Sequence, residues 1–303
     1  MQSRPHRVQV LLSLELGHSP ALMVACGFAH TMLLTADGEV YTCGLGSDGA
    51  NQTCLTLVNP TLFGTSAPIC MIAASHSHGM ALGSNDKLLW TGGNNRRGQL
   101  SHGTHGIVVD VPTLVPTARF DGAVVESMSG GGDHSLAVTV DSVLWACGDD
   151  DRGALRLGII VACNAFHRVG GEDVFDGQSV RLAVAGRSHL LVVTKDSTVW
   201  MCGHDALSGL PKSIPVNMFR FTRLDTAYPT FHNNFAVVAA GSDHCAGVTQ
   251  DGVLHTWSTT TTLKGQGTYY TDRGLLQQQF SRPIPYVLET QLVSLMTPLV
   301  KQS

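Results

Sequence analysis

Charged side chains are scarce in this sequence. Asp, Glu, Lys and Arg together make up 14% of the 303 residues, and the formal net charge is −4. The sequence contains no block of Lys or Arg, so we do not expect it to bind nucleic acid directly. It also contains no long uninterrupted run of apolar residues, which argues against a membrane-spanning helix.

The N-terminal segment carries no clear targeting signal. Residues 8–16 are apolar, but Gln9 and Glu15 interrupt them, so a strand is a better reading than a signal peptide. We therefore expect a cytoplasmic or nuclear protein. The Arg-bearing, acid-poor start leaves a mitochondrial location as the alternative.

Motifs of enzymes are also missing. The sequence has no G-x-S-x-G, no phosphate-binding P-loop, and no G-x-G-x-x-G that follows a strand and opens a helix. His76 with His78, and His102 with His105, have a loose metal-ligand spacing, but no Cys or carboxylate cluster supports either pair. We therefore predict no catalytic residues, no metal site and no cofactor.

Cysteine is present without the spacing of a metal or redox motif. None of the eight cysteines forms a C-x-x-C pair. Cys43, Cys147 and Cys202 stand at one position of a sequence repeat, just before a glycine. We predict that these three are buried free thiols in a reducing compartment.

The sequence is rich in glycine, with 33 residues, and it contains a fivefold repeat. Each copy reads Gly-x-x-His, then an alternating apolar segment, then a turn, then a β-branched or aromatic strand that ends in glycine. The five motif histidines are His30, His78, His134, His189 and His244. Successive histidines are 48 residues apart once and 55 or 56 residues apart in the other three intervals. A fixed period of this length indicates a repeat architecture.

Three landmarks keep their spacing from the motif histidine. Three residues before it stand Gly27, Ser75, Gly131, Gly186 and Gly241. Fourteen residues after it stand Gly44, Gly92, Gly148, Gly203 and Ser258. Between them lie the turn pairs Asp37-Gly38, Asn85-Asp86, Asp141-Ser142, Asp196-Ser197 and Asp251-Gly252.

Each repeat therefore predicts four short strands. Two of them flank the turn pair as a β-hairpin, because Asp, Asn, Ser and Gly tolerate the backbone of tight turns. A third strand precedes the Gly-x-x-His segment, and a fourth lies further upstream, as at residues 113–115 and 219–221. Four strands per unit at this period are typical of a propeller blade. We predict an all-β propeller, one domain over residues 1–303, with its axis lined by the Gly-x-x-His segments.

We expect structural roles for the motif residues. The landmark glycines allow a close backbone approach near a crowded centre. One histidine per repeat, always at the same place, suits a side chain that holds the blade together better than a metal or catalytic ring. The structural set is Gly27, His30, His78, Gly131, His134, Gly186, His189, Gly241 and His244.

The repeats resemble those of the regulator of chromosome condensation family. The first copy, residues 25–44, matches the family pattern nearly throughout, and residues 92–100 match its tail, Gly-Gly-Asn-Asn-Arg-Arg-Gly-Gln-Leu. The resemblance implies a β-propeller that acts through protein partners. It does not imply the family's chromatin binding, which rests partly on a basic arm, or its ultraviolet sensing, which uses tryptophans that the Gly-x-x-His motifs here lack.

The number of blades stays open at this point. The five repeats span about residues 4–52, 53–108, 109–163, 164–218 and 219–267, whereas the family usually has seven blades. Residues 282–287 echo residues 4–8, so residues 268–303 are either a closing strand or the start of a sixth repeat. The ring is incomplete, or further segments complete it to six or seven blades.

The residues between each motif glycine and histidine vary from repeat to repeat. Equivalent loops of a propeller meet at one rim, so these positions can carry partner specificity. Our candidates for partner binding are Phe28, His76, Asp133, Arg187 and Asp243.

Three functions suit these loops. The first is a non-enzymatic scaffold for protein–protein interaction. The second, implied by the resemblance, is a guanine-nucleotide exchange factor for a Ran-like small GTPase, with Asp133 and Asp243 at the matching acidic positions. The third is a structural subunit of a multi-subunit complex.

Overall fold

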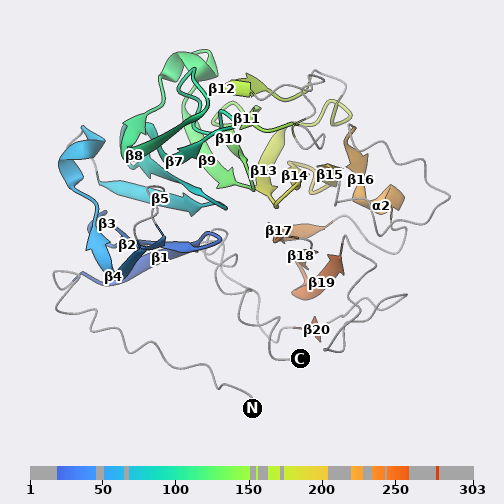
Figure 1. The fold of residues 1–303 in the computed structure, drawn as a ribbon. Helices are drawn as coiled ribbons and strands as arrows, with labels where there is room; N and C mark the ends of the chain where they lie inside the picture. Colours follow the sequence, from blue (N-terminus) through green and yellow to red (C-terminus); the bar gives the residue numbers. More distant parts are fainter. Residues whose placement is uncertain are drawn as a thin grey trace.

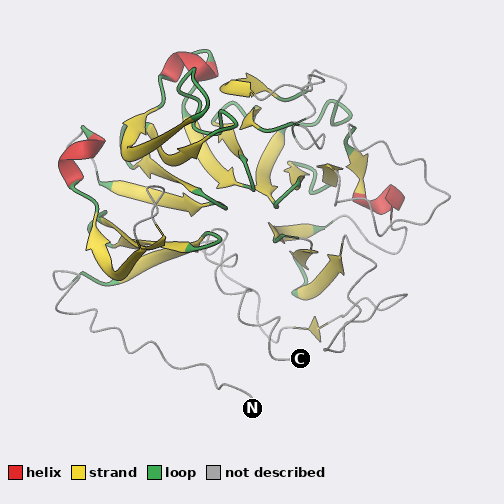
Figure 2. Cartoon of the chain, viewed as in Figure 1, coloured by secondary structure: helices red, strands yellow, loops and turns green. Residues whose placement is uncertain are grey.

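The structure is a computed structural model. It describes residues 19–45, 51–64, 68–150, 155, 163–170, 174–203, 220–227, 234–242, 244–258 and 278–279. Five four-stranded antiparallel sheets follow one another along the chain and form an arc, as Figures 1 and 2 show. This is the predicted β-propeller. Among the described residues, no helix has the length and apolar character that crossing a membrane requires.

The sheets are the blades, numbered in chain order. Blade 1 contains β1 (Ala21–Cys26), β2 (His30–Thr35), β3 (Val40–Leu45) and β4 (Asn51–Leu57). Blade 2 contains β5 (Ile69–Ala74), β6 (His78–Gly83), β7 (Leu89–Asn95) and β8 (Ile107–Leu114). Blade 3 contains β9 (Val125–Gly130), β10 (His134–Thr139), β11 (Leu144–Gly148) and β12 (Cys163–Arg168). Blade 4 contains β13 (Val180–Ala185), β14 (His189–Thr194), β15 (Val199–Gly203) and β16 (Thr222–Arg223). Blade 5 contains β17 (Phe235–Ala240), β18 (His244–Thr249), β19 (Val253–Ser258) and β20 (Gln278–Gln279).

In the described part of the chain, three short helical turns lie between the blades. They are the 3-10 helices η1 (Pro60–Phe63) and η2 (Thr117–Phe120) and the single turn α2 (Leu224–Ala227).

The fourth strand of each sheet follows the hairpin, and the expectation that it lies upstream of the Gly-x-x-His segment was wrong. Residues 113–114, for example, belong to β8 and pair with β7 of blade 2, not with β9 of blade 3. Sequence alone cannot assign such a strand, because the short connection that follows it fits either neighbouring sheet. Residues 282–303, on which the question of closure rests, lie outside the described residues.

The hairpin turns lie where the sequence placed them in four blades. Asp37-Gly38 joins β2 to β3 and Asp251-Gly252 joins β18 to β19, as predicted. The residue after the turn aspartate has a positive φ in every blade: Gly38, Lys87, Ser142, Ser197 and Gly252.

Blade 2 departs from the predicted register by one residue. Its turn is one residue longer, so Lys87 takes the left-handed position and His78 pairs with Gly93, not with Gly92. Gly93 has a φ of 110°, close to that of Gly44 at 108°. The predicted equivalence of Asn85-Asp86 and Gly92 with the other repeats was therefore wrong.

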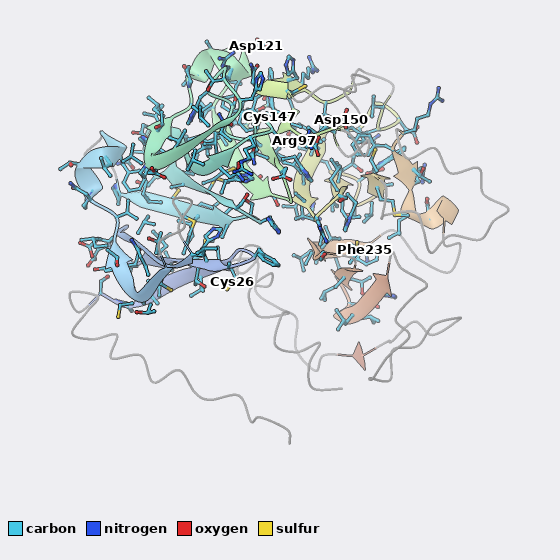
Figure 3. The ribbon with its side chains drawn as sticks, in the orientation of Figure 1. Cys26, Arg97, Asp121, Cys147, Asp150 and Phe235 are labelled. Atoms are coloured by element: carbon cyan, nitrogen blue, oxygen red, sulfur yellow. The ribbon has the colours of Figure 1, made fainter. Side chains whose placement is uncertain are left out.

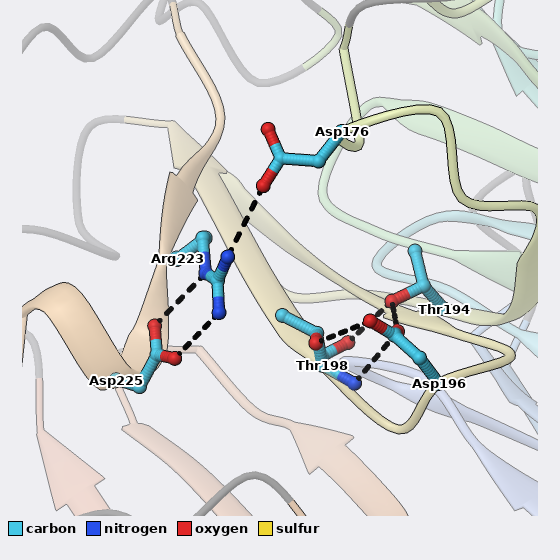
Figure 4. Close-up of polar contacts among 6 residues, drawn as sticks. All are labelled: Asp176, Thr194, Asp196, Thr198, Arg223 and Asp225. Carbon is cyan, nitrogen blue, oxygen red and sulfur yellow. Dashed lines mark hydrogen bonds and ion pairs between the residues drawn. The ribbon is translucent and has the colours of Figure 1, made fainter.

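The turn aspartate fixes the hairpin through its carboxylate. In blade 4, Asp196 Oδ1 accepts a hydrogen bond from the backbone N–H of Thr198, and Asp196 Oδ2 accepts one from the hydroxyl of Thr198 at 2.9 Å (Figure 4). Burial raises the pKa of Asp196, but the hydrogen bonds from Thr194 and Thr198 outweigh it and hold the pKa below its ordinary value.

Arg223 of β16, shown in the same figure, pairs with Asp225 at 2.8 Å and with Asp176 at 3.1 Å.

The hydrophobic core lies between consecutive blades. Each blade packs an aliphatic face onto the opposite face of the next blade, as when Met80, Leu82 and Leu89 of blade 2 meet Ala137 and Trp145 of blade 3. The same pairing of faces recurs between the other consecutive blades. Alternation in each strand produces this arrangement, because successive side chains point to opposite faces of a sheet.

The described tryptophans of the late blade strand are buried. Trp90, Trp145 and Trp200 have 2%, 6% and 6% of their surface exposed. Each meets the edge of a phenylalanine from the segment that precedes its blade, in the pairs Phe63–Trp90, Phe120–Trp145 and Phe175–Trp200. The side chain of Trp257 lies outside the described residues.

The Gly-x-x-His segments lie where the blades come closest. The ends of β1, β5, β9 and β13 converge towards the middle of the arc in Figure 1. A Cβ atom on Gly131 would stand 2.4 Å from the ring of His134 and 2.6 Å from the carbonyl oxygen of Gly186 in the next blade. Gly27 and Gly186 face the same obstruction from their own histidine and from the next blade.

Two motif histidines contact a side chain of the following blade. His78 Nε2 lies 2.7 Å from Ser135 Oγ, and Ser135 Oγ in turn donates to the carbonyl oxygen of Gln99 at 2.8 Å. The serine has only one proton to give, so His78 must carry its proton on Nε2 and donate to Ser135. His189 Nε2 lies 3.2 Å from Cys245 Sγ, and Cys245 occupies in blade 5 the position that Ser135 occupies in blade 3.

The equivalent side-chain contact is missing for His134, and also for His30, because Gly79 follows His78. Ser135 and Cys245 each follow a motif histidine, and in blade 4 that position holds Leu190. His134 Nε2, which should reach it, has no hydrogen-bond partner among the described residues. His30 is half-buried and makes a hydrogen bond to the backbone of His78.

We expect Gly131→Ala to lower the free energy of unfolding by about 1–3 kcal/mol, because the added methyl group overpacks the contact between blades 3 and 4. Gly92→Ala is the matched control, since its Cβ would meet nothing closer than 3.5 Å. Urea unfolding of both variants checks this. Equal stability of the two variants would contradict it.

The buried histidines predict acid sensitivity. Burial, reinforced by neighbouring histidines, lowers the pKa of His78 to about 3 and that of His134 to about 4. The unfolded chain takes up these protons near pH 6.5, so stability is complete above that pH and falls as the pH drops towards the folded values. Each histidine contributes a slope of up to about 1.4 kcal/mol per pH unit in this window.

His134→Gln should therefore reduce the slope of unfolding free energy against pH between 6.5 and 4.5. The exposed His167 provides the control His167→Gln, which should leave the slope unchanged. Chemical unfolding at a series of pH values measures both slopes. An unchanged slope in His134→Gln would show that His134 takes up its proton at the same pH in the folded protein as in the unfolded chain.

Candidate functional site

Backbone hydrogen bonds join the Gly-x-x-His loops into one belt. The N–H of Phe28 donates to the carbonyl oxygen of His76 at 3.3 Å, and the N–H of His76 donates to that of Gly131 at 3.0 Å. The belt continues from Gly132 N–H to the carbonyl oxygen of Arg187 at 3.2 Å, and from Arg187 N–H to that of Gly241 at 3.2 Å. The variable residues of blades 1 to 4 therefore lie on one rim, and their backbone is held in place from blade to blade.

Phe28 and His76 form an exposed aromatic pair on this rim. Their rings stack with centroids 4.5 Å apart and planes inclined by 23°. Phe28 has 77% of its surface exposed, the largest value among the exposed large hydrophobic residues, and His76 is exposed as well. The pair thus offers a broad apolar face to the surroundings.

The other predicted rim residues differ in their accessibility. Arg187 is exposed. Asp133 is half-buried, and its Oδ1 accepts a hydrogen bond from Gln99 Nε2 at 3.3 Å. Asp243 lies outside the described residues. The structure therefore brings together Phe28, His76, Asp133 and Arg187.

A loop that the site prediction left out completes this rim. It covers residues 94–101, the tail of the repeat in blade 2, and it begins with a hydrogen bond from Asn94 N–H to the carbonyl oxygen of Ser77 at 3.0 Å. Arg96 N–H donates to Asn94 Oδ1 at 2.9 Å, which places the exposed Arg96 next to the His76 loop. The signal for this loop was present in the Asn-Arg-Arg-Gly-Gln-Leu tail.

The same loop, together with Gly103 just after it, ties blade 2 to blade 3. Ser101 Oγ accepts a hydrogen bond from Phe166 N–H at 2.8 Å, and Gly103 N–H donates to the carbonyl oxygen of Asn164 at 2.8 Å. A Cβ atom on Gly98 would stand 2.6 Å from Asn164 Cα. Hydrogen bonds to blade 2 and to blade 3 thus fix the backbone of the loop that carries the exposed Arg96.

The three cysteines at the repeat position differ in their burial. Cys147 and Cys202 are buried, as predicted, whereas Cys43 is half-buried and Cys26 is exposed. Figure 3 shows Cys147 among packed side chains and Cys26 at the edge of blade 1. Burial raises the pKa of the Cys147 thiol well above its ordinary value. The prediction of three buried thiols was wrong for Cys43, because β3 lies on the end blade of the arc.

The described residues contain no group of three or more histidine, cysteine or acidic side chains that could hold a metal ion. His102, one of the loosely spaced histidines, instead lies with Nε2 2.8 Å from Thr91 Oγ1.

Comparison with known proteins identifies the repeat. The family described as "Regulator of chromosome condensation (RCC1) repeat" matches residues 24–50 and residues 86–138. Human "E3 ubiquitin-protein ligase HERC2" is 28% identical over 239 residues, which cover 77% of this chain and 5% of that protein.

Two solved structures share the fold. Human WBSCR16 superposes with a TM-score of 0.68 at 20% identity, over 79% of this chain and 62% of that one. Yeast RCC1 (Prp20), in a crystal structure with Kap60 bound, has a TM-score of 0.66 at 20% identity, over 84% of this chain and 59% of that one. The chain thus corresponds to less than two thirds of each of these three proteins. It is a β-propeller protein built from RCC1-type repeats.

Proposed function

We propose that this protein is a non-enzymatic scaffold that binds a protein partner through the rim of its Gly-x-x-His loops. The observation that carries the proposal is the exposed stack of Phe28 on His76, which presents two adjacent aromatic rings at a fixed position of the rim. Aromatic anchors at a fixed position are what protein interfaces use to gain most of their binding energy. Yeast RCC1, which shares the fold, is seen with a protein partner, Kap60.

The fixed backbone of the rim supports the same function. The belt of hydrogen bonds holds Phe28, His76 and Arg187 before any partner arrives. A preorganised surface loses little entropy on binding, so more of the contact energy appears as affinity. Variable side chains on such a frame can change partner without changing the fold.

Two further functions remain as alternatives. One is guanine-nucleotide exchange on a Ran-like small GTPase, because Asp133 stands at the acidic position that the resemblance assigns to the exchange face. The carboxylate of Asp133 is half-buried and already bonded to Gln99, which favours a supporting role for it. The other is a structural subunit of a larger complex, which would use the same rim.

Phe28→Ala should abolish partner binding and leave the melting temperature unchanged, because most of the Phe28 surface is exposed to solvent and contributes little to the packing of the protein. Val140→Ala is the matched control: Val140 is an exposed apolar residue (57%) in the turn at the opposite ends of the strands. Affinity capture with quantitative mass spectrometry compares the two variants. A partner retained by Phe28→Ala and lost by Val140→Ala would place the interface on the other rim.

We expect no acceleration of nucleotide release from a Ran-like GTPase. Release of a fluorescent guanine nucleotide, with and without the protein, measures this. Stimulated release that disappears in Asp133→Asn and survives in Asp121→Asn, where the carboxylate lies at a distant turn after η2, would establish the exchange function in place of the scaffold.

A further inference from the structure

We propose that the rim binds an extended acidic segment of its partner, whose apolar anchor residue packs on the Phe28–His76 stack and whose carboxylates pair with Arg96 and Arg187. The proposal rests on the proposed function, and adds to it the chemistry of the partner.

The rim differs in how it holds its acidic and its basic side chains. Asp133 accepts a hydrogen bond from Gln99, the buried Asp150 accepts one from Leu155 N–H at 2.7 Å, and Asp149 is half-buried, whereas Asp243 lies outside the described residues. Arg96 and Arg187 are exposed, and neither guanidinium has a hydrogen bond or ion pair within the described parts of the chain. Among the described residues of the rim, the exposed charged side chains are therefore arginines, although the whole chain carries a net charge of −4.

The positions of the two arginines suit a linear ligand. Arg96 follows Asn94, which is bonded to the His76 loop, and Arg187 lies in the loop bonded to Gly132 of blade 3. Hydrogen-bonded neighbouring segments lie about 5 Å apart, so the belt from blade 1 to blade 4 spans about 15 Å. An extended chain covers that distance with about five residues. One short segment can thus reach both the aromatic pair and the far arginine.

The chemistry of the two ends agrees with this ligand. Arginine presents a planar fork of donors that pairs with a carboxylate through two parallel hydrogen bonds. The stacked pair offers an apolar face with no carboxylate of its own, which suits an aromatic or aliphatic side chain. A basic segment would gain from the rings but would meet both arginines with like charge.

Fluorescence polarisation with the full-length protein tests the proposal. The probe is a labelled peptide with one tryptophan followed by about five glutamates, the length that the span requires. A second probe carries lysines in place of the glutamates. We expect the acidic probe to bind, with an affinity that falls as salt is added, and the basic probe to bind at least tenfold more weakly.

Variants then assign the contacts. Arg96→Ala and Arg187→Ala should each weaken binding of the acidic probe by about two- to fivefold, the usual effect of one exposed charge pair, and Arg187→Glu by more. Arg220→Ala removes an exposed arginine beside β16, at the outer strand of blade 4, and should have no effect. Melting temperatures of all four variants should equal that of the wild type.

Two results would overturn the acidic ligand. One is equal binding of the two probes, and the other is acidic binding that Arg96→Ala and Arg187→Ala leave unchanged. If the basic probe binds instead and Phe28→Ala abolishes its binding, the rim remains the interface and only the charge of the partner was wrong. If the partner captured by the wild type is retained in Phe28→Ala, the proposed function itself fails.

Discussion

At the middle of the arc, neighbouring blades lie so close that a side chain on Gly131 would stand 2.6 Å from the carbonyl oxygen of Gly186. This close approach explains why glycine precedes the motif histidine in four of the five repeats. Blade 2 has Ser75 there, and its hydroxyl exchanges hydrogen bonds with the backbone of His78. Where the loops touch, their backbone groups bond from blade to blade and the histidine rings fill the space beneath. The packing of the large faces further out depends on this alignment.

The same constraint creates the candidate site. A loop that must pass within hydrogen-bond distance of its neighbour has little freedom in its backbone, but the side chains that follow the glycine point away from the contact and are free to vary. Phe28, His76 and Arg187 occupy such positions. Structural and functional demands are thus met by adjacent residues of one short loop, the glycine and histidine for the fold and the residues between them for the surface.

In blade 2, the observed pairing of β6 with β7 differs by one residue from the predicted pairing, which shows how local the sequence pattern is. The landmarks His78 and Gly92 fit the spacing of the other repeats, yet the turn contains one more residue and Lys87 adopts the left-handed backbone that glycine or serine adopts elsewhere. Lysine gives no sign of this conformation in a sequence, since it enters it only when the flanking strands require it. The half-buried Cys43 is a similar case, because its repeat position is buried in blades that are covered on both faces.

The sequence by itself determined the repeat, the hairpins and the glycine and histidine landmarks, because each of these depends on the alternation and turn chemistry of a few neighbouring residues. Only the tertiary structure decided which sheet receives each fourth strand, that Phe28 stacks on His76, and that Gln99 engages Asp133 while Arg96 and Arg187 stay exposed. These contacts join different blades or distant loops, in the case of Phe28 and His76 48 residues apart. Their distances follow from how blades pack, and no local pattern records that packing.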